Sequence, residues 1–159
     1  MKPGDRLLCI FVRPQPLHAR FTSWSLHITL VPWFRVAKFA TELSTALSHI
    51  VSRCAPFEVA GTDSAYFGAK KNRLVRLLAV SPSLMGIEQD VRSYLHRQQS
   101  WIIDEVPGAH RDFQPHVTEQ DKEGLNSNET VWVNELNIVE QQATHKEVVG
   151  SIPLGKAAT

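Results

Sequence analysis

The order of strand and helix patterns along the chain restricts the possible folds more than any other feature of the sequence. Strand patterns at residues 5–12 and 25–31 precede a helix pattern that ends before Pro56, and further strand patterns follow it. A strand pattern at residues 73–80 precedes a second helix pattern, which is again followed by strand patterns. The same order therefore occurs twice, with each helix flanked by strands, and this predicts an α+β protein.

The two halves share no literal sequence repeat, so the expected duplication is one of architecture. No linker or low-complexity segment separates them, and residues 1–159 are therefore predicted to form a single two-lobed domain. A chain of 159 residues, with 43% hydrophobic and 21% charged residues, is long enough to bury a core without disulfides or a metal.

Both helix patterns have recognisable ends. The first has apolar residues at steps of three and four, and Pro56 stops it. Its apolar residues are Val36, Phe39, Ala40, Leu43, Leu47, Ile50, Val51 and Cys54. The second opens with Ser81 as the N-cap and Pro82 at the first helical position, and we expect it to run to about Gln98.

The remaining strand patterns are shorter or less regular. We expect short strands at residues 57–59 and 65–67 around the turn residues GTDS. Further strands are predicted at residues 114–120, 130–139 and 144–152.

Charge and composition exclude several functional classes. A net charge of +1 argues against a broad cationic surface for duplex nucleic acid or anionic membrane. The two cysteines, Cys9 and Cys54, are expected to be reduced core residues. The N-terminal apolar run is interrupted by Arg13 and Pro14 and is too short for a signal peptide or membrane span, which favours a cytoplasmic location.

Two of the predicted strands, one in each half, carry a histidine and a threonine two residues apart. They are SLHITLVPWF, with His27 and Thr29, and FQPHVTEQ, with His116 and Thr118. Because side chains alternate along a strand, the histidine and threonine of each motif share one face. None of the other five histidines has a threonine at this offset.

If the halves pack face to face, two imidazoles and two hydroxyls converge on one cleft. This combination suits phosphate ester chemistry, because one imidazole can take a proton from water while the other gives a proton to the leaving oxygen. Threonine hydroxyls can donate to the non-bridging phosphate oxygens. The scheme requires no metal, and no cofactor is expected.

The segments HITLVPWF and PHVTEQ resemble the paired H-x-T motifs of the 2H phosphoesterase superfamily, which includes the bacterial 2′,5′ RNA ligase and cyclic phosphodiesterase proteins. AYFGAKKNRLVRLLAV and SIPLG also look like family segments, so the resemblance covers nearly the whole chain. It implies two lobes related by a pseudo-twofold axis, each an antiparallel sheet with helices on the outer face, and a cleft between them.

The resemblance implies a metal-independent phosphodiesterase that opens the 2′,3′-cyclic phosphate of a nucleotide or an RNA end, or an RNA ligase that runs in the reverse direction. It implies His27 and His116 as the acid and base and Thr29 and Thr118 as phosphate ligands. Relatives suggest that His116 activates water and that His27 protonates the leaving oxygen.

The sequence departs from the family pattern at two positions. Gln114 stands where many relatives have an arginine, which removes a potential charge contact to the substrate. Glu119 replaces an apolar residue and is expected to point away from the cleft. Arg76 alternates with apolar residues, and this places it either at an exposed edge or in the cleft as a phosphate ligand.

The neighbouring basic residues Lys70, Lys71 and Arg73 are typical of a solvated hairpin tip. The aromatic residues Trp33, Phe34, Tyr66 and Phe67 favour core packing, although one aromatic ring at the cleft rim could hold a nucleobase.

Two other functional classes remain open from the sequence. The cleft could bind a nucleotide or RNA end without turnover, as a binding module. A zinc hydrolase with the histidines as ligands is less well supported, since the chain has no HExxH or HxH motif. The expected partner is a nucleotide or RNA end with a cyclic phosphate, bound by a monomer, with specificity set by the loops at 13–24, 60–72 and 104–112.

Overall fold

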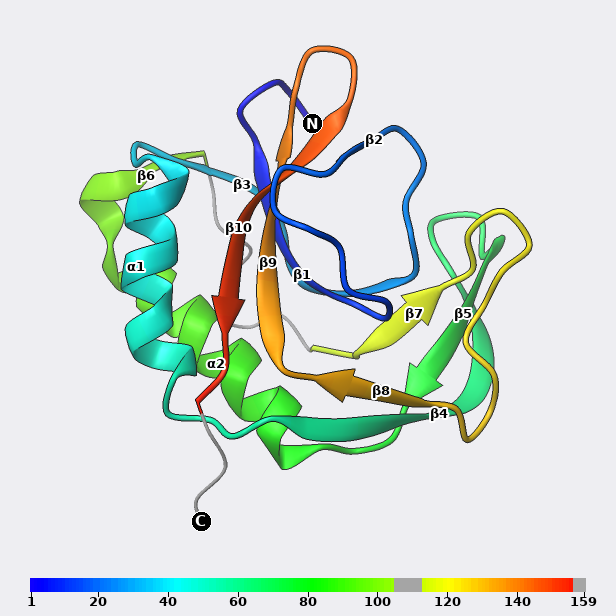
Figure 1. Ribbon diagram of the computed structural model, residues 1–159. Coiled ribbons are helices and arrows are strands. Elements are labelled where there is room, and N and C mark those ends of the chain that lie inside the picture. The colour runs from blue at the N-terminus through cyan, green and yellow to red at the C-terminus, as the bar shows by residue number, and fades with distance from the viewer. Residues whose placement is uncertain (105–112, 156–159) are drawn as a thin grey trace.

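The computed structural model describes residues 1–104 and 113–155, which form ten strands, two α-helices and one short 3₁₀ helix (Figure 1). The strands are β1 (Arg6–Phe11), β2 (Arg20–Phe21), β3 (His27–Val36), β4 (Phe57–Phe67), β5 (Arg73–Leu78), β6 (Ile102–Asp104), β7 (His116–Thr118), β8 (Thr130–Val133), β9 (Glu135–Gln141) and β10 (Lys146–Pro153). The helices are α1 (Ala40–Val51), α2 (Pro82–Arg97) and the 3₁₀ helix η1 (Gln99–Trp101).

Nine strands form a continuous antiparallel path in the order β2-β10-β9-β1-β3-β7-β5-β4-β8, and β6 pairs with β3 beside it. The path divides into two lobes. The first lobe comprises β2, β10, β9, β1 and β3, and the second comprises β7, β5, β4 and β8; they meet where β3 pairs with β7. The predicted α+β class and two-lobed antiparallel arrangement are thereby confirmed.

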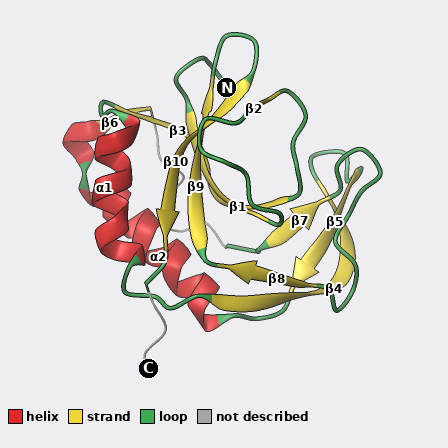
Figure 2. Ribbon diagram, in the orientation of Figure 1, coloured by secondary structure: helices red, strands yellow, loops and turns green. Residues whose placement is uncertain are grey.

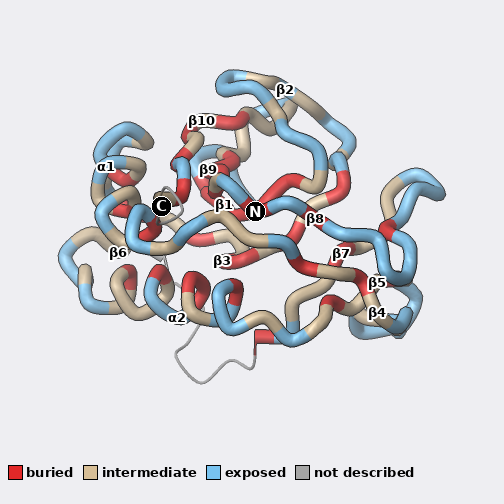
Figure 3. The backbone as a smooth tube through the Cα atoms, turned by 60° about the horizontal axis from the view of Figure 1, so that its bottom comes forward, coloured by how far each residue is buried: buried red, intermediate tan, exposed pale blue. Residues whose placement is uncertain are grey.

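The described helices cover one face of the sheet, as Figure 2 shows, and we call the opposite face the open face. The main core lies between sheet and helices, where α1 buries Leu43, Leu47 and Val51. The buried segments of α2 turn toward the central strands (Figure 3). A smaller apolar cluster lies on the open face, formed by Leu7, Cys9, Phe11, Val139 and Val148 with Ala19, Phe21, Trp24 and Trp33 packed against it.

The two helix starts differ in how well the sequence predicts them. Helix α2 begins as expected, because the hydroxyl of Ser81 accepts a hydrogen bond from the amide of Leu84 at 3.2 Å. Helix α1 begins only at Ala40, and the expectation that Val36 belongs to it was wrong. Val36 pairs with Ile102 of β6, so strand pairing extends β3 into the predicted helix.

Two strand predictions also need correction. The residues GTDS are not a turn but part of one long strand, β4, which pairs first with β8 and then with β5, and its register shifts between Gly61 and Ser64. The predicted strand at 130–139 is two strands, because β8 pairs in the second lobe and β9 in the first. The change of partner at Asn134 is a tertiary effect that local alternation does not reveal.

Along the described ranges, no helix has the length and apolar character needed to cross a membrane.

Candidate functional site

The two H-x-T motifs lie side by side where the lobes meet. Strand β3 begins at His27, β7 consists of the motif His116–Thr118, and Ile28 pairs with Val117 in antiparallel register. This register puts Thr118 across from His27 and His116 across from Thr29, all on the open face. A local twofold axis at the Ile28–Val117 pair therefore exchanges the two motifs.

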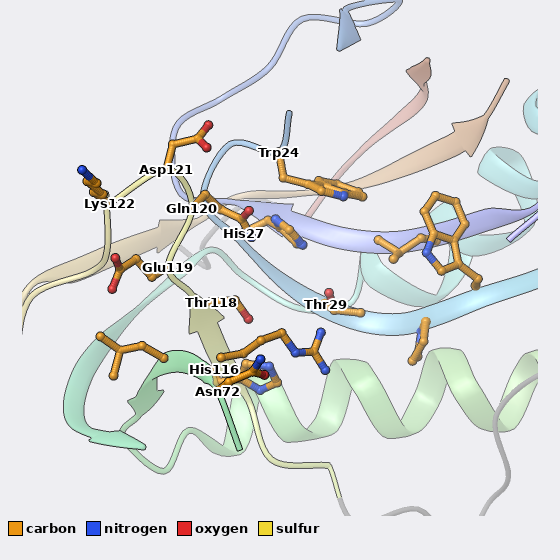
Figure 4. A pocket seen from close by; sticks show the side chains of 15 residues that line it. Trp24, His27, Thr29, Asn72, His116, Thr118, Glu119, Gln120, Asp121 and Lys122 are labelled. Atoms are coloured by element: carbon orange, nitrogen blue, oxygen red, sulfur yellow. The ribbon is translucent and has the colours of Figure 1, made fainter. Parts of the chain in front are cut away.

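The four motif side chains line one cleft of about 700 Å³ (Figure 4). Opposed residues on one face of an antiparallel pair have Cβ atoms roughly 5 Å apart, and diagonal ones are separated by roughly 7–8 Å. The two histidines occupy a diagonal, so a phosphate-sized group fits between them. The other lining residues are Leu7, Trp24, Pro32, Trp33, Asn72, Arg73, Leu74, Glu119, Gln120, Asp121 and Lys122.

Both histidines are held in the same way. The Nδ1 atom of His27 lies 2.8 Å from the carbonyl oxygen of Ser25, and Nδ1 of His116 lies 2.8 Å from that of Gln114. A carbonyl oxygen can only accept, so Nδ1 carries the proton in each contact. The Nε2 atom is then the basic nitrogen of each neutral ring.

The two imidazoles have different surroundings. The ring of His27 is tilted by 31° to that of Trp24, with centroids 4.2 Å apart, and Phe11 contacts it at 6.2 Å. Burial lowers the pKa of His27 below its ordinary value, and the nearby charge of His116 lowers it further, against the hydrogen bond to Ser25, which raises it. The ring of His116 instead meets Phe67 edge to face at 4.8 Å.

The structure does not bring Arg76 into this cleft. Arg76 lies opposite Val117 on β7, and it therefore faces away from the side of the sheet that carries His116 and Thr118. Its guanidinium donates to the carbonyl oxygens of Leu125 and Thr62 at 2.9 and 2.8 Å. These contacts link β5 to β4 and to the loop that precedes β8. The guanidinium of Arg76 is therefore not placed to contact a phosphate in the cleft.

Among the described residues, the arginine that lines the cleft is Arg73, at the start of β5. A tight turn places it there: Gly68 has a φ of +98°, and its carbonyl accepts from the amide of Lys71 at 2.9 Å. A Cβ atom on Gly68 would lie 3.1 Å from Nε of Arg73, so glycine leaves room for this side chain. Arg73 pairs across the hairpin with Phe67, which contacts His116.

Comparison with models of protein families identifies the family of this chain. The family model described as the 2′-5′ RNA ligase superfamily matches residues 11–144. The chain belongs to this superfamily. No curated protein matches it in a sequence search.

Several solved structures share the fold of this chain. The protein TT0787 of Thermus thermophilus is 16% identical and superposes with a TM-score of 0.62 over 97% of this chain and 100% of that one. A protein described as a phosphoesterase is 18% identical, with a TM-score of 0.60 over 98% and 100% of the two chains. LigT of E. coli is 16% identical, with a TM-score of 0.60 over 96% and 99%.

Several cleft residues of this superfamily member were not singled out by sequence reasoning. Arg73 was noted only within a basic hairpin tip, and Trp24 and Asn72 only as members of the loops 13–24 and 60–72. Nearly all of the third loop, residues 105–112, lies outside the described residues. Glu119 belongs to the lining, and Figure 4 shows its carboxylate turned away from the two histidines, as alternation predicts.

Within residues 1–104 and 113–155, no group of three or more His, Cys, Asp or Glu side chains is arranged to hold a metal ion.

Proposed function

We propose that this protein is a metal-independent phosphodiesterase that opens the 2′,3′-cyclic phosphate of a nucleotide or an RNA end. His27 and His116 act as general acid and base, and Thr29 and Thr118 bind the phosphate. The observation that carries the proposal is the antiparallel Ile28–Val117 pair, which brings both motifs to one cleft.

The proposed step needs one neutral and one protonated imidazole. Nε2 of the neutral ring takes a proton from water, and the water oxygen forms a bond to phosphorus. The bond from phosphorus to one ribose oxygen breaks, and that oxygen receives the proton of the imidazolium. The product is a phosphate monoester beside a free hydroxyl.

The threonines and Arg73 supply the stabilisation of charge in this scheme. Each threonine lies across the strand pair from the histidine of the other motif, so its hydroxyl can donate to a non-bridging oxygen. Arg73 lines the same cleft and adds a positive charge. We therefore assign to Arg73 the phosphate contact that Arg76 cannot make.

The environment of His27 bears on which histidine is the acid. The family resemblance implies His27 as the acid, yet burial lowers its pKa and favours the neutral ring in the substrate-free protein. A bound phosphate is negatively charged and raises the pKa of an adjacent imidazole. We propose that substrate binding itself protonates His27 for the acid role.

The nature of the substrate is supported by relatives. LigT of E. coli has been crystallised in complex with 3′-AMP and with phosphate. A nucleotide that carries its phosphate on the ribose 3′ oxygen corresponds to one product of opening a 2′,3′-cyclic phosphate.

The test is hydrolysis of 2′,3′-cyclic nucleotides by the purified protein in the presence of EDTA. His27→Gln and His116→Gln are each expected to lower kcat by roughly 10² to 10⁴-fold, the usual contribution of a general acid or base. His49→Gln is the matched control, since His49 is exposed on α1 and does not line the cleft. Full activity in either cleft variant would contradict the assigned roles.

The alternative is a module that binds a nucleotide or RNA end in the same cleft without turnover. It would be favoured by tight binding of 3′-AMP together with no hydrolysis of any cyclic nucleotide tested.

A further inference from the structure

The two walls of the cleft differ in chemistry, although the motifs between them are nearly symmetric. The wall from the first lobe is apolar and aromatic, with Leu7, Trp24, Pro32 and Trp33. The opposite side is mostly polar and carries charges of both signs, with Asn72, Arg73 and residues 119–122 beside the apolar Leu74. A ligand with one flat apolar end and one anionic end therefore has a single favourable orientation across the motifs.

A bulge in β3 builds the apolar wall. In the pairing of β1 with β3, Leu7 on β1 lies opposite two residues of β3, Pro32 and Trp33. The flanking pairs are Leu8–Val31 and Arg6–Phe34. Such an extra residue bends a strand and redirects its side chains. Here Val31 and Phe34 both enter the helix-covered core, while Leu7, Pro32 and Trp33 line the cleft.

The two tryptophans of this wall are not equivalent. The ring of Trp24 is already packed, with centroids of His27 at 4.2 Å and Phe21 at 5.0 Å, and the ammonium of Lys146 lies 5.7 Å from its centre. In the described part of the chain, Trp33 makes a ring contact with Trp24 only, at 6.3 Å. Both tryptophans are half-buried and line the cleft, but Trp33 makes fewer ring contacts than Trp24 among the described residues, so more of its indole face is left for a planar ligand.

We propose that Trp33, flanked by Leu7 and Pro32, stacks on the nucleobase of the substrate and makes the protein prefer purine over pyrimidine nucleotides. This inference rests on the proposed function for its substrate class. Every base has a π-face, so stacking gives affinity without reading hydrogen bonds, and the larger purine ring gains more contact. The two motifs and Arg73 then hold the phosphate.

The test is the Kd of 3′-AMP, 3′-UMP and inorganic phosphate, measured by calorimetry for the intact protein and its variants. Trp33→Leu keeps an apolar side chain but removes the aromatic face, and it is expected to weaken 3′-AMP binding about tenfold. The preference for 3′-AMP over 3′-UMP should shrink, and phosphate binding should not change. Trp33→Phe is expected to restore most of the affinity for 3′-AMP.

Trp132→Leu is the matched control, because Trp132 is 54% exposed on β8 and does not line the cleft. Equal 3′-AMP affinity in wild type and Trp33→Leu, or no 3′-AMP binding by the wild type, would overturn the inference. A parallel loss of phosphate affinity in Trp33→Leu would also overturn it, because that pattern indicates a structural role. Failure of hydrolysis alone, with the Trp33-dependent binding intact, would count against the proposed catalysis and not against the base subsite.

Discussion

At the scale of the residue, two backbone carbonyls decide which nitrogen each motif histidine uses. Ser25 and Gln114 each precede their histidine by two residues, and each accepts from Nδ1 at 2.8 Å. Each ring therefore keeps a fixed orientation, and in the proposed reaction the two histidines would exchange protons through Nε2. The departure at Gln114 leaves this anchor intact, since the contact uses its backbone oxygen.

The titration of His27 should show the effects of burial and of the neighbouring His116 on its pKa. In the substrate-free protein we expect its NMR titration midpoint below the ordinary imidazole value of 6.5, because burial and the charge of His116 disfavour the imidazolium. His116→Gln should raise the midpoint by removing that charge, and saturating phosphate should raise it as well. A midpoint at or above 6.5 in the substrate-free protein would contradict this prediction.

Substitutions of the two arginines of β5 should affect different properties: Arg73 should affect substrate binding, and Arg76 should affect stability. Arg73→Ala is expected to raise KM for a cyclic nucleotide about tenfold with an unchanged Tm, since Arg73 is an exposed cation of the cleft. Arg76→Ala should leave KM unchanged and lower the free energy of unfolding by about 1–3 kcal/mol, because two carbonyls lose their donor. Kinetics and urea unfolding of the same pair of variants check both statements.

The sequence indicated the four motif residues because their spacing is local, but it could not choose between these arginines. Residues 73 and 76 lie on opposite faces of one strand, and the alternation of side chains does not show which face lines the cleft. Only the register of β5 against β7 shows which arginine faces the cleft, and that pairing joins residues about 40 positions apart.

At the scale of the element, helix α1 packs very closely on strand β10. A Cβ atom on Gly150 would lie 2.7 Å from the hydroxyl of Ser44 and 2.8 Å from Cδ1 of Ile138. A glycine at this position lets the helix approach the strand. This contact holds α1 against the first lobe, to which β3 and one of the motifs also belong.

Gly150→Ala should therefore destabilise the protein by about 1–3 kcal/mol through overpacking. Gly86→Ala is the opposite case: a Cβ atom there meets no described atom within 4 Å, and the residue lies inside helix α2. This variant should be more stable by about 0.5–1 kcal/mol, because alanine favours the helix. Urea unfolding curves of the two variants should move in opposite directions.

Elements with local end signals were predictable, and elements defined by their partners were not. The cap and proline at the start of α2 act within one turn, and the sequence located them correctly. The length of β4, the break between β8 and β9 and the extension of β3 all depend on pairing with distant strands. Local patterns carry no information on those partners.

At the scale of the whole molecule, the lobes do not follow the order of the chain. Strands β9 and β10 come from the end of the sequence, yet they complete the first lobe beside β1. All six residues of β1 are buried between its two neighbours, β3 and β9. The first motif therefore depends on residues that lie more than 100 positions downstream.

A chain that ends at residue 134 retains both H-x-T motifs but lacks β9 and β10. We expect this truncated protein to show no cooperative urea transition by circular dichroism, because β1 and the core face of α1 lose their partners. A folded and active truncated protein would show that the site does not require β9 and β10.

The twofold relation between the motifs also has a stereochemical consequence. On the proposed chemistry, a cyclic phosphate turned by half a revolution about the Ile28–Val117 axis meets the same two imidazoles and the same two hydroxyls. These groups alone cannot discriminate the 2′ from the 3′ oxygen as the one that leaves. On this chemistry, the two walls of the cleft determine which ribose oxygen leaves. Placing the apolar residues on the second-lobe wall and the charged residues on the first-lobe wall should change which monoester forms, with the same two histidines and two threonines.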